Sequence, residues 1–190
     1  MKNFNQARNQ GGFSLIELLL VLAIIAALAV AAFIVYPRVQ AGRNASYESQ
    51  ILSSAQAGVK ALFVVSNYRN ISKAVAFNAE IFPKNMNFSA TDIQNQWGGA
   101  VDVTPALSNG AAAAAGTTPV RYFRIVYPTV PTDVCIRLAG AAVQNFGTVT
   151  VQGVIVQDVY SATQVPLNEA LISTNCKQTD GNADLVFVSN

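Results

Sequence analysis

The chain of 190 residues carries 12 Lys and Arg, 10 Asp and Glu, and no histidine. The lack of histidine excludes His-based catalytic triads, imidazole metal ligands and the usual proton shuttle. Lys2 and Arg8 account for the net charge of +2, so residues 13–190 have a formal balance of zero. The basic bias therefore belongs to the N-terminal end and does not indicate nucleic-acid binding.

The N-terminal end has the pattern of a targeting segment. Residues 1–12 are polar and basic, and an apolar run follows from Phe13 to Tyr36. As a helix, this run would span about 36 Å, enough to cross the hydrocarbon core of a bilayer. Because the basic residues precede the run, residues 1–12 are expected to stay in the cytoplasm while the rest of the chain faces out.

One acid, Glu17, lies inside the start of this apolar run, and Leu18 to Tyr36 contains no charged residue. A carboxylate in lipid costs at least ~2.5 kcal/mol on insertion scales, so an acid there indicates a function and a partner. Two plainer interpretations stay open. One is a secretory signal peptide cut near Ala27–Ala29, and the other is a simple membrane anchor, which leaves Glu17 without a purpose.

A short basic leader that ends in Gly12, followed by Phe13-Ser14-Leu15-Ile16-Glu17 and some twenty apolar residues, resembles the class III signal of type IV prepilins. The resemblance implies that a membrane prepilin peptidase cuts between Gly12 and Phe13 and N-methylates Phe13. It also implies that Glu17 helps to recruit subunits. A carboxylate in apolar surroundings needs a cation, and the Phe13 amine of a neighbouring subunit would supply one.

The helix is expected to run from Phe13 to about Asn67. Residues 13–36 would be a transmembrane and polymerisation helix, and residues 37–67 an amphipathic half that packs on a globular partner. Glu48 is expected to lie off the apolar stripe of this second half. The stripe recurs at steps of three and four residues and comprises Ile51, Ala55, Val59, Leu62 and Ser66.

Pro37 and Gly42 lie between the two halves. Proline removes a helical hydrogen bond and clashes with the preceding turn at a cost of ~3 kcal/mol, which predicts a kink or local melting near residues 33–42. A compatible alternative is that Pro37 only marks the exit from the membrane. Many type IVa pilins carry their helix-breaking proline about one turn nearer the N-terminus, where this chain has Ile34.

Residues 68–190 predict a globular α+β head, in which an antiparallel sheet covers the exposed half of the long helix. Loops are expected over 85–90, 94–99 and 107–119, and Trp97 is expected to anchor its loop on the core. Strands are expected over 100–104, 121–127, 148–158 and 184–188. Two short helices are expected over about 132–144, capped by Thr132 or Asp133, and about 166–174.

Cys135 and Cys176 are the only cysteines, and their separation does not fit a paired-cysteine zinc site. In an exported domain the natural interpretation is a disulfide, with two free buried thiols as the alternative. The cysteine surroundings resemble the heads of type IVb pilins, in which the bridge pins a C-terminal region, here bounded by residues 135–176. Type IVb leaders are usually longer than this one and their mature chains usually do not begin with Phe, so the N-terminus is type IVa-like.

No carboxylates form a catalytic motif with a nucleophile or base, and no enzyme activity, metal or cofactor is expected. Arg121, Arg124 and Arg137 could form a basic patch for DNA or lipopolysaccharide, but they are interpreted as a solvated strand face that pairs with acids. Asp180, Asn182 and Asp184 could form a calcium loop, but they are interpreted as a surface turn.

The sequence therefore predicts a structural subunit of a type IV pilus. Its precursor would sit in the bacterial inner membrane with the prepilin peptidase and the pilus assembly machinery, and mature copies would form a helical extracellular filament, or fimbrium. Such a filament serves surface adhesion, twitching motility, DNA uptake or conjugation. The nearest alternative is a pseudopilin of a type II secretion system. A singly anchored envelope binding protein or enzyme is a third.

Overall fold

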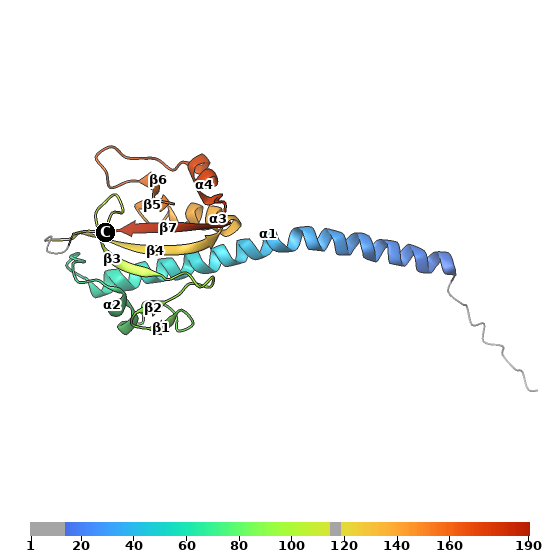
Figure 1. The fold of residues 1–190 in the computed structure, drawn as a ribbon, viewed down its shortest axis with the longest axis horizontal. Helices are drawn as coiled ribbons and strands as arrows, with labels where there is room; N and C mark the ends of the chain where they lie inside the picture. Colours follow the sequence, from blue (N-terminus) through green and yellow to red (C-terminus); the bar gives the residue numbers. More distant parts are fainter. Residues whose placement is uncertain (1–13, 115–118) are drawn as a thin grey trace, which may run out of the picture. The chain divides into compact units, whose positions relative to one another are not determined.

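The computed structural model describes residues 14–114 and 119–190 (Figure 1). The chain divides into two compact units, Met1–Val39 and Gln40–Asn190, and the second is called the head below. Helix α1, Leu15–Leu62, begins in the first unit and ends in the second. This confirms the expected long N-terminal helix, although Phe13, its expected first residue, lies outside the described residues.

The head contains a five-stranded antiparallel sheet in the order β3-β4-β7-β5-β6. The last strand along the chain, β7, lies between β4 and β5 and pairs with both (Figure 1). The predicted α+β class with an antiparallel sheet is therefore confirmed. The strands are β3 Asp102–Ala106, β4 Tyr122–Pro131, β5 Thr148–Val151, β6 Val154–Asp158 and β7 Asn182–Ser189.

Alternate side chains of the strands build the core. In β4, Phe123, Ile125 and Tyr127 are fully buried, while the residues between them are partly exposed. Leu185 and Phe187 of β7 continue the same buried layer, and α1 covers it through Leu52 and Val59. This is the period of two that a sheet with one covered face requires.

The stripe of α1 that faces this core agrees with the predicted one at Ile51, Ala55 and Val59 and differs from it at both ends. Leu62 is half exposed, and Glu48, which was expected to lie off the stripe, is 1% exposed. An acid normally lies outside a core, so the predicted stripe began at Ile51 and left out the turns from Ala41 to Glu48. The buried residues that do follow alternating steps of four and three are Ala41, Ala45, Glu48, Leu52, Ala55 and Val59, with Ile51 beside them.

The helix also ends earlier than Asn67. It ends at Leu62, and Ser66 has a φ of 51°, a left-handed conformation that a helix continuing to Asn67 could not contain. Tyr68 then donates its backbone N–H to the Val120 carbonyl, and the Asn67 side chain accepts the N–H of Val120. The chain is thus drawn toward β4 after Leu62, so the expected boundary at Asn67 was wrong by a turn and a half.

Pro37 and Gly42 both lie within continuous helix. The local melting expected near residues 33–42 is therefore absent from this structure, because Pro37 removes one helical hydrogen bond while the flanking turns keep theirs, and Gly42 removes none. A kink at these positions stays a prediction. Burial in the head begins at Ala41, a few residues after Pro37.

Two short helices flank the sheet. Helix α3, Thr132–Ala142, and helix α4, Glu169–Cys176, lie close to the predicted segments, and a disulfide joins Cys135 to Cys176 as predicted. The expected cap of α3 was wrong: Pro131 occupies that position without a side-chain bond. The Thr132 hydroxyl instead donates to the Cys176 carbonyl, which adds a second link between the two helices.

Several elements of the head were not expected. Residues 148–158 form a hairpin rather than one strand, since Gln152 and Gly153 both have positive φ, as a two-residue turn requires. Helix α2, Lys73–Asn78, and the short pair β1, Asn87–Ser89, and β2, Asp92–Ile93, fall in segments expected to be loop or left unassigned. Elements of two to six residues are too short to show a period.

The loop from Gln94 to Gly99 is fixed by one side chain. Asn95 accepts the backbone N–H groups of Trp97 and Gly99, and it donates to the Pro128 carbonyl at 2.7 Å. Trp97 packs partly buried against the core, as expected. The loop lies so close to β4 that a methyl group on Gly99 would overlap the Pro128 carbonyl oxygen.

Gly99→Ala should therefore destabilise the head by at least ~2 kcal/mol, because neither backbone can move without breaking the Asn95 bonds. Gly140→Ala is the matched control. Its new methyl group meets nothing within 4 Å in α3, and it should be neutral or stabilise by up to ~1 kcal/mol. Urea unfolding of both variants measures the difference, and equal midpoints would show that the close approach is not tight.

Removing the disulfide by the double change Cys135→Ala and Cys176→Ala should lower the free energy of unfolding by about 4 kcal/mol in the chain-entropy model. Both cysteines are fully buried and 41 residues apart, so alanine leaves no unpaired polar atom. Denaturant unfolding of the variant and the oxidised parent measures the loss. A loss below about 1 kcal/mol would mean that the links between α3 and α4 hold this region without the bridge.

Candidate assembly segment

The predicted processing site lies at the edge of the described residues. Gly12 and Phe13 fall outside them, so the structure does not test cleavage or methylation. Ser14 directly precedes α1, and its carbonyl accepts the backbone N–H groups of Glu17 and Leu18 at 3.0 and 3.2 Å. Glu17 is thus placed in the first helical turn, three residues after Ser14.

This position suits a carboxylate for a local reason that the sequence analysis missed. Ser14 and Glu17 have the Ser-x-x-Glu spacing of a capping box, in which the acid stands beside unpaired N–H groups. The positive end of the helix dipole also favours a negative charge in the first turn, typically by 0.3–1 kcal/mol. The placement of Glu17 in the first turn therefore favours the start of the helix at this point.

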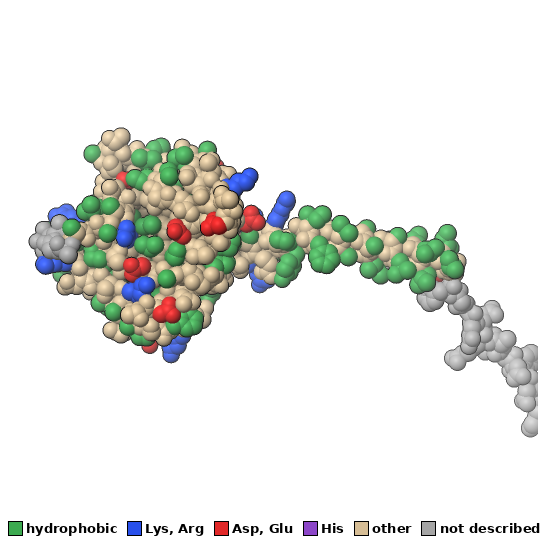
Figure 2. All heavy atoms as spheres, in the orientation of Figure 1, with side chains coloured by type: hydrophobic (Ala, Val, Ile, Leu, Met, Phe, Trp, Pro, Cys, Tyr) green, Lys and Arg blue, Asp and Glu red, His purple; other side chains and the backbone are tan. Residues whose placement is uncertain are grey.

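Within the part of the chain that the structure describes, no ion pair is found at Glu17. The surface around it is uncovered: every residue from Leu15 to Val39 is exposed, including Leu15 at 75% and Phe33 at 80%. Figure 2 shows hydrophobic side chains along the visible face of this part of α1. α1 is long and apolar enough over this stretch to cross a membrane. A helix that is apolar all round needs lipid or other helices as its surroundings.

The three arginines considered as a basic patch lie in different settings. Arg124 donates to the Thr104 hydroxyl and to the Gly110 carbonyl, both at 3.0 Å. Arg137 reaches Gly42 of α1, and Arg121 lines two hollows near the start of β4. Asp180 and Asp184 each accept a backbone N–H. The hydrogen bonds of Arg124, Asp180 and Asp184 therefore hold turns and a strand face of the head itself.

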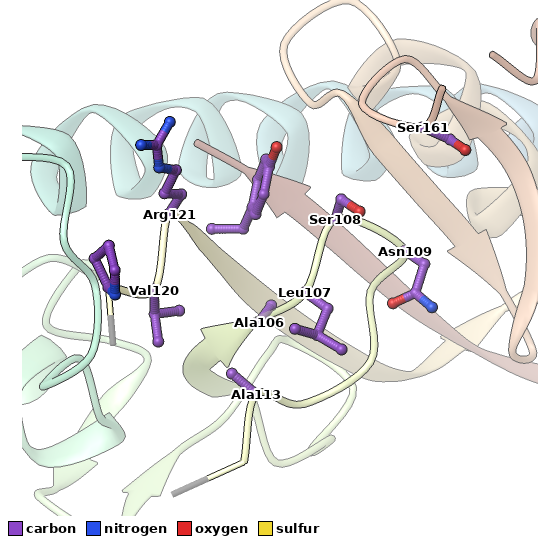
Figure 3. Close-up of a pocket in the computed structure, with 10 residues that line it drawn as sticks. Ala106, Leu107, Ser108, Asn109, Ala113, Val120, Arg121 and Ser161 are labelled. Carbon is purple, nitrogen blue, oxygen red and sulfur yellow. The ribbon is translucent and has the colours of Figure 1, made fainter. Parts of the chain in front are cut away.

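The hollow in Figure 3 has a volume of about 540 Å³. It lies between the turn that follows β3, where Leu107, Ser108 and Asn109 are, and the start of β4, where Val120 and Arg121 are. Arg121 is the one charged side chain in its lining. Among the described residues no group of three or more His, Cys, Asp or Glu could hold a metal ion. The described residues that line the hollow offer neither a nucleophile and base pair nor a metal centre.

Comparisons with known proteins agree with this geometry. Residues 42–190 match the family described as PilS N terminal, and residues 7–33 match the prokaryotic N-terminal methylation motif. The second match spans Gly12, Phe13 and Glu17. No curated protein matches the chain.

Two solved structures have a similar fold. TcpA, a type IV pilin from Vibrio cholerae El Tor biotype, shares 14% identity at a TM-score of 0.56, covering 78% of this chain and 99% of its own. A type IVb pilin from Salmonella typhi shares 18% identity at a TM-score of 0.53, covering 75% and 97%. At these identities the likeness concerns the fold.

The head and the N-terminal motif are matched by two separate family models, and both matches indicate a pilin. The PilS N terminal match covers well over half of the chain, and the methylation motif covers the start of the apolar helix. The chain belongs to the PilS N terminal family and is a type IV prepilin.

Proposed function

We propose that this chain is a filament-forming pilin, cut between Gly12 and Phe13, in which Glu17 pairs with the Phe13 amine of a neighbouring copy. As a type IV prepilin it is a structural protein, made as an inner-membrane precursor that becomes part of an extracellular pilus. The observation that carries the proposal is the exposed apolar surface of residues 15–36 of α1, in which Glu17 is the one charged residue. Cleavage would create the matching cation.

The energetics favour pairing between copies. An isolated carboxylate or ammonium in apolar surroundings is costly, whereas a pair that also satisfies its hydrogen bonds removes both costs together. Only the copy in one axial register brings the amine to the carboxylate. The pair would therefore select a register while apolar helix surfaces replace lipid with each other.

A surface pilus is proposed in preference to a pseudopilin because the head belongs to the PilS N terminal family and its C-terminal region is closed by a disulfide. Adhesion, twitching motility, DNA uptake and conjugation stay predictions for that filament. Mass spectrometry of filaments sheared from cells tests the proposal. The expected result is abundant filaments made of chains that begin with methylated Phe13. A chain that keeps Met1 and stays in the membrane fraction would overturn the proposal.

Gly12→Leu should block cleavage, because prepilin signals of the kind that this chain resembles are cut after a glycine and the variant places a bulky side chain there. Intact-mass measurement should find residues 1–12 retained, with the protein in the inner membrane. Gln10→Ala, a change within the same polar leader, is the control and should be processed normally. Normal filaments from Gly12→Leu would refute the assigned cleavage position.

Glu17→Ala should be cleaved and methylated but should give at least about tenfold fewer filaments. Losing a charge pair that stabilises the assembled state by ~1.4 kcal/mol or more lowers the equilibrium constant for assembly by that factor. Glu17→Gln separates charge from size and should fail in the same way. The yield of sheared filaments, set against mature protein in the membrane, is the measurement. Filament yields equal to wild type from both variants would remove the charge pair from the proposal.

A further inference from the structure

The first turns of α1 on the head are held differently from the later ones. In residues 40–48 the buried side chains are Ala41, Ala45 and Glu48, whereas residues 51–59 bury Ile51, Leu52, Ala55 and Val59. Burying an Ile, Leu or Val side chain gives ~1.5–3 kcal/mol, against ~0.8 kcal/mol for one methylene-sized group. Apolar burial therefore holds residues 51–59 several times more strongly.

The backbone of residues 40–48 is also the weaker helix. Gly42 lies in the helix interior, where glycine is less favourable than alanine by ~1 kcal/mol. Asn44 and Ser46 are modest helix formers as well, and the Ser46 hydroxyl bonds back to the Gly42 carbonyl at 3.0 Å, an arrangement that tends to bend helices. Besides the small buried side chains of Ala41 and Ala45 and a long hydrogen bond of 3.5 Å from the Asn85 amide to the Tyr47 hydroxyl, the described contact that holds this segment on the head is that of Glu48.

That contact is a buried carboxylate with neutral partners. The Tyr127 hydroxyl of β4 and the backbone N–H of Gln96 both donate to Glu48. In the described part of the chain, no Lys or Arg forms an ion pair with it. A buried anion without a cation is costly, whereas the protonated acid at the same place is not.

The groups around Glu48 give no compensating charge. Tyr47 lies next to it on α1, and burial beside Glu48 raises the pKa of Tyr127, which stays neutral. The adjacent cavity of about 300 Å³ is lined by further uncharged residues: Asn85, Met86, Phe88, Gln94, Asn95, Gln96 and Gly98. Two charged groups of neighbouring elements have partners elsewhere: the Gln94 amide donates to Asp92 of β2, and the Arg137 guanidinium of α3 lies beside Gly42 of α1.

We propose that Glu48 is a proton-controlled latch, which holds residues 40–48 of α1 on the head when it is protonated and loosens them when it ionises, while residues 51–59 stay docked. Helical residues rise 1.5 Å each and extended ones up to ~3.4 Å, so the nine latch residues can lengthen from ~13 to ~30 Å. Each subunit would then carry a short extensible segment directly after its apolar helix.

The direction with pH follows from the burial. Desolvation raises the pKa of Glu48 above 4.5, with its two hydrogen bonds acting in the opposite direction. The stabilising contribution of Glu48 is therefore complete below pH 4.5 and is lost as the pH rises through the pKa of the folded state. Residues 40–48 should open more often at high pH.

Hydrogen exchange read by mass spectrometry tests the latch on the full chain in detergent micelles. Wild type and Glu48→Gln are compared at each pH from 4 to 8, so the intrinsic effect of pH on exchange cancels. Glutamine keeps an oxygen for Tyr127 and Gln96 but never ionises. At pH 8, residues 40–48 of wild type should exchange at least about tenfold faster than in the variant, with no difference at pH 4.

Residues 51–59 serve as the internal control and should exchange alike in both proteins. Glu80→Gln, which neutralises an exposed acid, should behave as wild type. The latch would be overturned by any of three results. Residues 40–48 could exchange equally fast in wild type and Glu48→Gln at pH 8, the two proteins could still differ at pH 4, or residues 51–59 could be released together with residues 40–48. Should Glu48→Gln not fold, Tyr127→Phe replaces it: removing a donor to the ionised acid should speed exchange of residues 40–48 at pH 8, and unchanged exchange would overturn the proposal.

Discussion

The fold of the head depends on the burial of one stripe of α1 against the inner face of the sheet. Leu52 and Val59 cover the layer formed by Phe123, Ile125 and Phe187, so neither the helix nor the sheet could keep its apolar face from water alone. Because α1 is one continuous helix, the element that completes the core of the head also carries the exposed apolar surface of residues 15–39.

The same helix thus places two carboxylates in apolar surroundings, and each needs a different solution. Glu17 stands in the first turn, where the helix dipole supports its charge but no ion pair is found within the described residues. Glu48 has its partners, Tyr127 and Gln96, within its own head. The proposed pairing therefore links Glu17 to another copy, whereas Glu48 regulates how the chain holds its own helix.

The C-terminal part of the chain closes the head. β7 is the last strand to be made but lies in the middle of the sheet, between β4 and β5. The disulfide from Cys135 to Cys176 and the bond from Thr132 to the Cys176 carbonyl tie α4 to α3 just before β7 begins. Strands β4 and β5 are joined in the sheet only through β7, so the stability of the head depends on residues 182–189.

Long or strongly patterned features could be predicted from the sequence alone. The apolar run after Gly12, the isolated Glu17, the long helix and the two cysteines each rest on composition or spacing that no tertiary contact can alter. Short or contact-dependent features could not be. β1, β2 and α2 are too short to show a period, and the helix end at Leu62 depends on bonds from residues 67 and 68 to Val120. Glu48 is the clearest case: its sequence position indicated an exposed acid, and only packing against Tyr127 decided that it is buried, because burial of a carboxylate depends on partners that come from elsewhere in the fold.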